Sequence, residues 1–308
     1  FAKTAPAALL CLRTDVRILA SPKPHNPPVS GKEWVINMEE RDNAMREKLA
    51  SIRCFILDMD GTIYLGDRLF SCTRPFLKQL DERGICHCYF TNNSSRNAGF
   101  YRDKLAHMGI PAGEGEIITS NMVTIDYLQR HHPGQRVFLL GTPYLREDFE
   151  RAGIPLDDDN PEVVVIGFDT TLCYERLERV CTFVRSGLPF YGVNPDFNCP
   201  ADMGRQLPDC GSIARLIEAS TGRLPVFLGK PSAASLEYIL KHVGFRAEET
   251  AIVGDRLYTD MKLGEGTPLT TILVLSGETT RDEVRHSALQ PDLVVEDLAE
   301  LAALLPVT

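Results

Sequence analysis

Two carboxylates stand at the end of one apolar run. Asp58 and Asp60 follow Cys54–Leu57 and directly precede Gly61. An apolar run that ends in acidic residues and a turn is typical of a buried strand in a parallel sheet. Ligands bind at the carboxyl edge of such sheets. Two acids at that edge repel each other and lose hydration, so a cation or a proton must offset them. A divalent metal ion facing a phosphate group would meet this need.

Three further polar segments also follow predicted strands. They are Thr91-Asn92-Asn93-Ser94, Gly229-Lys230-Pro231-Ser232, and the run from Val253 to Asp260 that contains Asp255. Because the carboxyl ends of parallel strands lie at one edge of a sheet, we expect all four segments to meet there. Together they bring acidic, hydroxyl, amide and lysine groups, which suit a metal ion and a phosphate.

Strand and helix patterns alternate along the chain, as in a parallel α/β sheet. The expected strands are Cys54–Leu57, Ile85–Phe90, Val137–Leu140, Val163–Phe168, Pro189–Val193, Pro225–Gly229, Thr250–Val253 and Thr270–Leu275. The expected helices are Glu39–Leu49, Arg74–Arg83, Asn97–Met108, Asn121–His131, Tyr144–Ala152, Tyr174–Arg185, Gly211–Thr221, Ala233–Val243 and Leu298–Leu305. The sequence therefore predicts a Rossmann-like parallel-sheet core of the α/β class.

The spacing of the polar segments predicts an inserted folding unit. Thr91 and Lys230 are 139 positions apart (230 − 91), whereas one strand-helix-strand unit needs only ~30 residues. We therefore expect a core in two parts, 38–135 and 223–308, with an α/β unit at 136–222 between them. A unit over the active edge would exclude water and contact the leaving group. Residues 1–37 include the proline-rich run Ser21–Pro28, so we expect a flexible extension there.

The composition narrows the class of protein. The chain has 308 residues, 44% of them hydrophobic, and a net charge of -9. These values indicate a folded protein and argue against nucleic acid or an anionic membrane as a partner. No apolar run approaches the ~20 residues of a membrane span. The run Ala7–Leu12 is too short for the core of a signal peptide.

The cysteines indicate a cytoplasmic protein. There are nine, an odd number, and most lie within apolar runs, which fits reduced thiols better than a disulfide framework. A metal site at Cys86-His87-Cys88 is the alternative for three of these side chains. That segment fits a strand, however, and no second pair has zinc-finger spacing.

The four polar segments, in this order and each after a strand, resemble the four motifs of the haloacid dehalogenase (HAD) superfamily. The first is Asp58-Met59-Asp60-Gly61-Thr62. The other three are similar to those of class IIA, the NagD-like and p-nitrophenylphosphatase-like hydrolases. The resemblance extends from about residue 50 to the end of the chain. It implies a C2-type cap for the inserted unit, and a Mg²⁺-dependent phosphatase for a small phosphomonoester such as a sugar phosphate.

The same resemblance implies roles for the acids. Asp58 would attack phosphorus and form an aspartyl phosphate, while Asp60 would act as general acid and then base. Mg²⁺ would be bound by the side chains of Asp58 and Asp255 and by the main-chain carbonyl of Asp60.

It also implies phosphate contacts from Thr91, Asn92, Asn93 and Lys230. Lys230 would neutralise phosphoryl oxygens. For Asn93, holding the loop is an equal alternative.

Several further residues are expected to support the site. Asp260 would orient Lys230 or a metal-bound water, or cap the following helix. Thr62 would orient Asp60 or end its turn.

Within the inserted unit, Asn194 and Asp196 are predicted to contact the substrate, or to form a turn instead. Cys199 stands where family members that act on pyridoxal phosphate place a histidine, which argues against that substrate. Asp209 is predicted to cap a helix.

Two other functions stay open from the sequence. One is a phosphotransferase or mutase of the same superfamily, although Asp60 and Thr91 are too close for the cap that such enzymes usually carry between them. The other is a non-catalytic phosphate-binding module, although neither Asp58, Asp60 nor Lys230 is missing. The small phosphorylated metabolite and the oligomeric state are also open, and a homodimer through the cap is one expectation.

Overall fold

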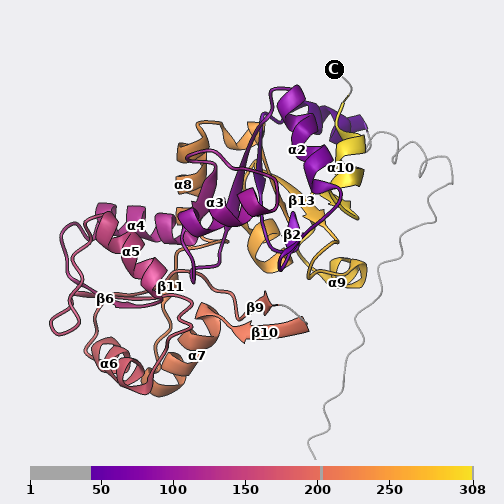
Figure 1. Ribbon diagram of the computed structural model, residues 1–308. Helices are drawn as coiled ribbons and strands as arrows, with labels where there is room; N and C mark the ends of the chain where they lie inside the picture. The colour runs from indigo at the N-terminus through magenta and orange to yellow at the C-terminus, as the bar shows by residue number, and fades with distance from the viewer. Residues whose placement is uncertain (1–42, 202–203, 307–308) are drawn as a thin grey trace, which may run out of the picture. The chain divides into compact units, whose positions relative to one another are not determined.

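A computed structural model describes residues 43–201 and 204–306. The predicted extension 1–37 and the start of the helix predicted at Glu39–Leu49 lie outside these residues, and the rest of that helix runs from residue 43 to 51. The described residues belong to one compact unit, Asp42–Thr308. Its elements can be followed in Figure 1.

The larger sheet has six strands in the order β14-β13-β12-β1-β4-β5, and every neighbouring pair is parallel. Its strands are β1 Cys54–Leu57, β4 Cys86–Thr91, β5 Ile117–Thr119, β12 Thr250–Gly254, β13 Thr270–Val274 and β14 Leu293–Val295. All four residues of β1 are 0% exposed, because both faces of a parallel sheet are covered by helices.

Helices cover both faces of this sheet. Phe55 and Leu57 pack with α2 Thr73–Glu82, α3 Ala98–His107 and α10 Leu298–Leu304. Ile56, between them, points to the other face. There it packs with residues of α4 Ser120–His131 and α8 Ala233–Val243. This alternation is the two-residue period of a strand.

A second parallel sheet has four strands in the order β11-β8-β7-β6. Its strands are β6 Val137–Leu140, β7 Val163–Ile166, β8 Phe190–Gly192 and β11 Val226–Phe227. Helices α6 Tyr174–Arg185 and α7 Cys210–Thr221 pack on one face, and α5 Pro143–Arg151 packs on the other. A hairpin of β9 Asn198–Ala201 and β10 Arg205–Pro208 leads into α7. The predicted fold class, a parallel-sheet core with an inserted α/β cap, is confirmed.

One expected strand belongs to the other sheet. The sequence placed Pro225–Gly229 in the core with the strands before the other polar segments. This was wrong, because β11 pairs in parallel with β8 of the second sheet. Only Val226 and Phe227 are in the strand. We therefore propose that the inserted unit extends past residue 222, to about 229.

Several short elements were not predicted from the sequence. They are the hairpin of β2 Tyr64–Leu65 and β3 Arg68–Leu69, strands β5, β9, β10 and β14, helix α9 Arg281–His286, the 3-10 turn Ala247–Glu249 and the π-helix Leu257–Met261. Two- to four-residue strands are too short to show a hydrophobic period.

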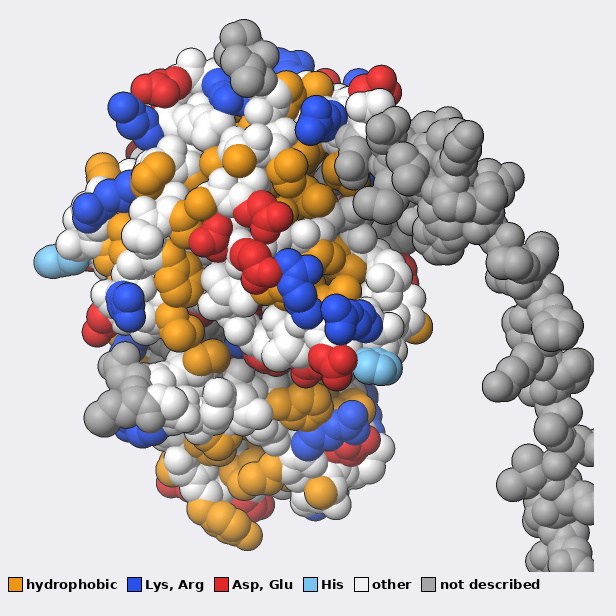
Figure 2. All heavy atoms as spheres, turned by 90° about the vertical axis from the view of Figure 1, so that its right-hand side faces the viewer, with side chains coloured by type: hydrophobic (Ala, Val, Ile, Leu, Met, Phe, Trp, Pro, Cys, Tyr) orange, Lys and Arg blue, Asp and Glu red, His pale blue; other side chains and the backbone are white. Residues whose placement is uncertain are grey.

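The cysteines, the helices and the surface charges bear on the expectations drawn from the composition. The eight cysteines within the described ranges are free, and Cys86 is exposed at the edge of the Cys86-His87-Cys88 segment in β4. None of the helices in the described part of the chain has the length and apolar character to cross a bilayer. On the face in Figure 2, Lys and Arg side chains lie scattered among Asp and Glu. That nucleic acid is not a partner stays a prediction.

Candidate active site

Three of the four polar segments lie at the carboxyl ends of neighbouring core strands. β1 leads into Asp58, β4 ends at Thr91, and β12 leads into Asp255. The fourth segment follows β11 of the second sheet, yet it reaches the same place. Lys230 Nζ lies 2.6 Å from Asp58 Oδ1. The convergence expected from the sequence is therefore present, although its lysine comes from the cap side.

Lys230 is held between two acids. Its side chain is 1% exposed, and Nζ donates to Asp58 Oδ1 and Asp260 Oδ1 at 2.6 Å each, and to Phe90 O at 3.1 Å. Burial alone would lower the pKa of Lys230, but the charges of Asp260 and Asp58 raise it above its ordinary value. The lysine is therefore charged at neutral pH. Asp260 has the contact predicted for it, and it lies within the π-helix Leu257–Met261 rather than at a helix N-cap.

Asp58, Asp255 and Asp260 form the candidate metal site. Their ligand oxygens all lie within 4.8 Å of one another, the one such acidic, His or Cys group found among residues 43–201 and 204–306. Burial raises the pKa of Asp58 well above its ordinary value, although Lys230 opposes the shift. Burial and the charge of Asp260 raise the pKa of Asp255 to about 7. A bound cation would relieve these buried charges.

The surroundings of Asp255 fit a metal ion. Its Oδ2 accepts a hydrogen bond of 2.7 Å from Glu278 N, while its Oδ1 is buried and has no hydrogen-bond partner among the described residues. A Cβ added to Gly61 or Gly277 would lie 2.3 or 2.0 Å from Asp255 Oδ2, so only glycine leaves room there. Carboxylate oxygens are the hard ligands that Mg²⁺ prefers. The residues present therefore suit Mg²⁺.

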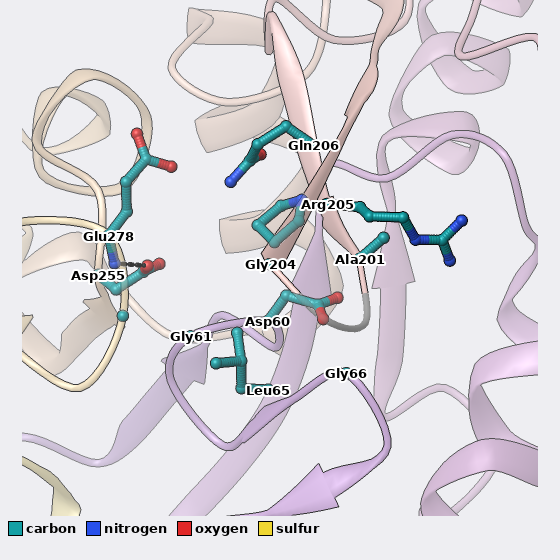
Figure 3. Close-up of a pocket in the computed structure, with 12 residues that line it drawn as sticks. Asp60, Gly61, Leu65, Gly66, Ala201, Gly204, Arg205, Gln206, Asp255 and Glu278 are labelled. Carbon is teal, nitrogen blue, oxygen red and sulfur yellow. Dashed lines mark hydrogen bonds between the residues drawn. The ribbon is translucent and has the colours of Figure 1, made fainter.

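Asp60 stands between two cavities. A small one of about 30 Å³ is lined by Asp58, Thr91 and Lys230 as well as Asp60. A larger one of about 340 Å³, drawn in Figure 3, is lined by Asp60 and by residues of the β9–β10 hairpin. Burial raises the pKa of Asp60, and Lys104 and a hydrogen bond from the Tyr64 hydroxyl lower it by less. An acid in this position can serve a group that extends from the small cavity into the large one.

Thr62 does not orient Asp60 as one of our expectations had it. Thr62 is 0% exposed, and its hydroxyl oxygen makes no hydrogen bond with any described residue. Instead, the hydroxyl of Tyr64 donates to Asp60 Oδ2 at 3.3 Å. The sequence analysis did not assign Tyr64 a role, because spacing alone does not reveal this contact.

Thr91, Asn92 and Asn93 line the small cavity. The Asn92 side chain binds the main chain of Lys230, since its Oδ1 accepts from Lys230 N at 2.9 Å and its Nδ2 donates to Lys230 O at 2.9 Å. Asn93 Oδ1 accepts from Ser95 N and Ser95 Oγ at 3.0 and 2.7 Å. Asn93 thus holds its own loop, and the Asn92 side chain positions Lys230. The predicted phosphate contact of Asn92 would therefore be made by its main-chain N–H.

The side chains of Asn194 and Asp196 both have hydrogen-bond partners within the protein. Asn194 is 0% exposed, and its Oδ1 accepts from Ser94 Oγ at 2.7 Å. Asp196 accepts from Asn92 Nδ2 at 2.8 Å and from Arg256 Nη1 at 2.6 Å. These contacts connect the cap to the loops that carry the catalytic candidates. Asp196 also lines the small cavity, and the substrate contacts predicted for Asn194 and Asp196 stay a prediction.

Arg256 is the functional candidate that the sequence reasoning missed. It forms ion pairs with Asp196 at 2.6 Å and with Glu278 at 2.8 Å. Its pKa is raised, because the nearby acids outweigh the effect of burial. Arg256 directly follows Asp255 in the fourth segment. This position is the signal by which it could have been identified from the sequence.

Asp209 caps α7 as predicted, since its side chain accepts from Cys210 N. Burial, and then the charge of Asp196, raise the pKa of Asp209 to about 7. A carboxyl group whose pKa is higher in the folded protein than in the unfolded chain destabilises the fold. This cost grows as the pH rises from the pKa of the unfolded chain toward the folded pKa of about 7. We therefore expect Asp209→Asn to raise the free energy of unfolding by about 1–2 kcal/mol at pH 8 and by less at pH 5.

Urea unfolding at both pH values measures this difference. The amide oxygen of the variant can still accept from Cys210 N, so the cap is retained. Asp297→Asn, at the N-cap of α10, corrects for the loss of a capping carboxylate. A stabilisation that is larger at pH 5 than at pH 8 would contradict the raised pKa.

A parallel-sheet core with a buried lysine and three acids at its carboxyl edge, under an inserted α/β cap, defines a capped hydrolase for phosphorylated compounds. Comparison with known proteins is in accord with this class. Residues 55–155 match the family described as haloacid dehalogenase-like hydrolase, and residues 227–301 match a HAD-hydrolase-like family. An acid sugar phosphatase of Staphylococcus aureus is 34% identical over 252 residues, which cover 82% of this chain and 97% of that protein.

Solved structures of relatives agree with this match. A 4-nitrophenylphosphatase from Thermotoga maritima superposes with a TM-score of 0.80 and 44% identity, over 83% of this chain and 98% of that one. NagD from E. coli K-12 superposes with a TM-score of 0.75 and 29% identity, over 81% of this chain and 98% of that one. The chain therefore belongs to the haloacid dehalogenase-like hydrolases, in the NagD-like and p-nitrophenylphosphatase-like branch. The predictions of this family and of a phosphatase are confirmed.

Proposed function

We propose that the protein is a Mg²⁺-dependent phosphatase that hydrolyses a small phosphomonoester through an aspartyl phosphate on Asp58. The observation that carries this proposal is the position of Lys230 Nζ, 2.6 Å from Asp58 Oδ1 at the wall of a 30 Å³ cavity. A charged lysine there can hold a phosphoryl group against the carboxylate that attacks it. The names of the relatives, which include phosphatases, support the same chemistry.

In the first step, a carboxylate oxygen of Asp58 forms a bond to phosphorus and the bond from phosphorus to the leaving oxygen breaks. The electron pair of the broken bond goes to the leaving oxygen, which takes the proton of Asp60. Asp60 suits this role because burial raises its pKa, so that it holds a proton more readily than an exposed acid. Lys230 offsets the negative charge of the phosphoryl oxygens.

In the second step, Asp60, now a carboxylate, takes a proton from a water molecule. The oxygen of that water bonds to phosphorus, and the bond between phosphorus and Asp58 breaks. Inorganic phosphate leaves, and both acids return to their starting states. Asp196 accepts hydrogen bonds from Asn92 and Arg256, and all three line the small cavity, so they help to limit access of other water.

Mg²⁺ would be held by the carboxylates of Asp58 and Asp255 and by the main-chain carbonyl of Asp60. When bound, it supplies positive charge that lets a phosphate dianion approach these acids. Asp260 belongs to the same group of oxygens, and it keeps Lys230 in place.

The larger cavity supports a sugar phosphate or a similar metabolite as the substrate. Its volume of about 340 Å³ suits a leaving group the size of a sugar. Figure 3 shows Gln206 pointing into this space and Glu278 standing across from it, whereas the guanidinium of Arg205 points away. An amide and a carboxylate are partners for hydroxyl groups. Leu65 and Ala201 add apolar surface.

Phosphate release from p-nitrophenyl phosphate and from a panel of sugar phosphates, nucleotides, glycolate phosphate and pyridoxal phosphate tests the proposal. We expect release with Mg²⁺, a loss of at least ~100-fold in EDTA, and recovery when Mg²⁺ is added back in excess. Sugar phosphates should have the highest kcat/KM of the panel. Undiminished release in EDTA would contradict the metal requirement. Transfer of phosphate to a sugar hydroxyl, without release, would indicate a mutase instead.

A further inference from the structure

Tyr64 is attached to Asp60 through both its side chain and its main chain. The hydroxyl donates to Asp60 Oδ2 at 3.3 Å. A β-bridge joins the two residues, and Gly61 N donates to Tyr64 O at 2.7 Å. Gly61 has φ +92°, a conformation that suits glycine and lets the chain turn tightly between the two residues. The phenol therefore has little freedom to move relative to the carboxyl group.

The ring of Tyr64 is fixed from outside this turn. Tyr64 is 0% exposed, and Lys104 Nζ of α3 lies 4.0 Å from the centre of its ring. A cation over an aromatic face is held by the ring's charge distribution. Thr73 Oγ1 donates to Ile63 O at 2.7 Å and so anchors the preceding residue. Helices on the core side of the site thus set the direction of the Tyr64 hydroxyl.

Tyr64 is also adjacent to the wall of the leaving-group cavity. Leu65, the next residue, lines the 340 Å³ cavity together with Asp60. Tyr64 and Leu65 form β2, and their side chains point to opposite faces of it. One face of this short strand therefore contacts the acid, and the other meets the group that the acid would protonate.

We propose that Tyr64 is a positioning residue that acts through Asp60, by holding Oδ2 so that Oδ1 carries the proton delivered to the leaving oxygen. This inference rests on the proposed function, in which Asp60 is the general acid. Tyr64 keeps its own proton throughout, and the proton that moves is the one on Asp60. Lys104 supports Tyr64 by lying over the face of its ring.

The test is Tyr64→Phe in the full chain with Mg²⁺, assayed on a series of phosphate esters. An alkyl phosphate such as glycerol phosphate needs its leaving oxygen protonated, whereas p-nitrophenolate leaves readily as an anion. We expect kcat/KM to fall by ~10-fold or more for the alkyl ester and by less than ~3-fold for p-nitrophenyl phosphate. KM should change little for either ester, because the hydroxyl does not contact the phosphate.

A double substitution separates positioning from a general loss of structure. If Tyr64 acts through Asp60, Tyr64→Phe should have little further effect on kcat/KM for the alkyl ester once Asp60→Asn is present, since interacting residues are not additive. Tyr89→Phe is the matched control. Tyr89 is 1% exposed and belongs to the same apolar cluster as Tyr64, and loss of its hydroxyl should leave the whole ester series unchanged.

Two results would overturn the inference about Tyr64. One is an equal loss of kcat/KM for every ester when Tyr64 is replaced by Phe. The other is the same fold loss from Tyr64→Phe whether or not Asp60→Asn is also present. A different pattern would reject the proposed function itself. That pattern is an Asp60→Asn variant whose kcat/KM, which reports on the first step alone, falls equally for the alkyl and p-nitrophenyl esters, and in that case the inference about Tyr64 falls with it.

Discussion

Asp58→Asn is expected to lose phosphatase activity on p-nitrophenyl phosphate by a factor of ~10⁴ or more in kcat, with Mg²⁺ present. The amide cannot form an acyl phosphate, and it is a weaker ligand for a cation than a carboxylate. Phosphate release, measured against the background rate without protein, gives the loss. Because this substrate has a good leaving group, the result reports on the nucleophile more than on the general acid.

The fold should survive this substitution. Asparagine has the size of aspartate, and its side-chain oxygen can still accept from Lys230 Nζ, which now lies 2.6 Å from Asp58 Oδ1. Thermal unfolding of the variant therefore checks that the loss of activity is chemical. Asp282→Asn is the control for loss of a charge, because Asp282 is 78% exposed on α9; it should keep full activity.

Trapping the intermediate makes the prediction sharper. After acid quench with a substrate labelled in its phosphate, label should remain on the unmodified protein and be absent from Asp58→Asn. In Asp60→Asn, label should accumulate, because no base activates the water that removes it. Full activity of Asp58→Asn, or label at another residue, would reject Asp58 as the nucleophile.

The core and its acidic edge could be predicted because buried parallel strands leave a simple pattern. β1 is an uninterrupted apolar run, and the polar residues directly after it must lie at the carboxyl edge. The same argument located Thr91 at the end of β4 and Asp255 directly after β12. Some helices were also accessible, since α6 and α8 begin and end at the predicted residues.

The features that the sequence did not reveal depend on contacts between residues that are far apart in the chain. β11 has two residues, and nothing in its sequence tells which of two parallel sheets it joins. Asn194 and Asp196 looked like free polar groups of a loop, yet both are buried among partners more than 50 positions away, such as Arg256 for Asp196. Only the folded chain shows which polar groups are already paired.

The hydroxyl partner of Asp60 was missed for a related reason. Thr62 is close to Asp60 in sequence, but its hydroxyl makes no hydrogen bond with any described residue. Tyr64 lies two residues further, and the turn at Gly61 brings its hydroxyl back. Sequence spacing alone favours the wrong residue here.

Lys230→Met is expected to lower the free energy of unfolding by ~3–5 kcal/mol at pH 8 in EDTA. Methionine fills a similar volume, so the main effect is electrostatic. The substitution leaves Asp58 and Asp260 buried without the cation that now lies 2.6 Å from each. Activity on p-nitrophenyl phosphate should fall by ~10³-fold or more, because the positive charge next to the phosphoryl group is lost.

Mg²⁺ and pH should each reduce this loss of stability. A bound cation replaces part of the missing charge, so Mg²⁺ should stabilise Lys230→Met more than the unmodified protein. Without the lysine, the pKa of Asp58, which burial already raises, rises further in the folded state. The folded variant then binds more protons than the unfolded chain, and its deficit in stability should shrink as the pH falls from 8 to 5.

Urea unfolding of both proteins, with and without Mg²⁺ and at both pH values, measures these effects. Lys241→Met is the control, because Lys241 is 72% exposed on α8 and its loss should change stability by less than about 0.5 kcal/mol. If Lys230→Met were as stable as the unmodified protein in EDTA at pH 8, the buried lysine would not be compensating the acids. The acids would then be protonated in the folded state, and Asp58 would lack the charge that a nucleophile needs.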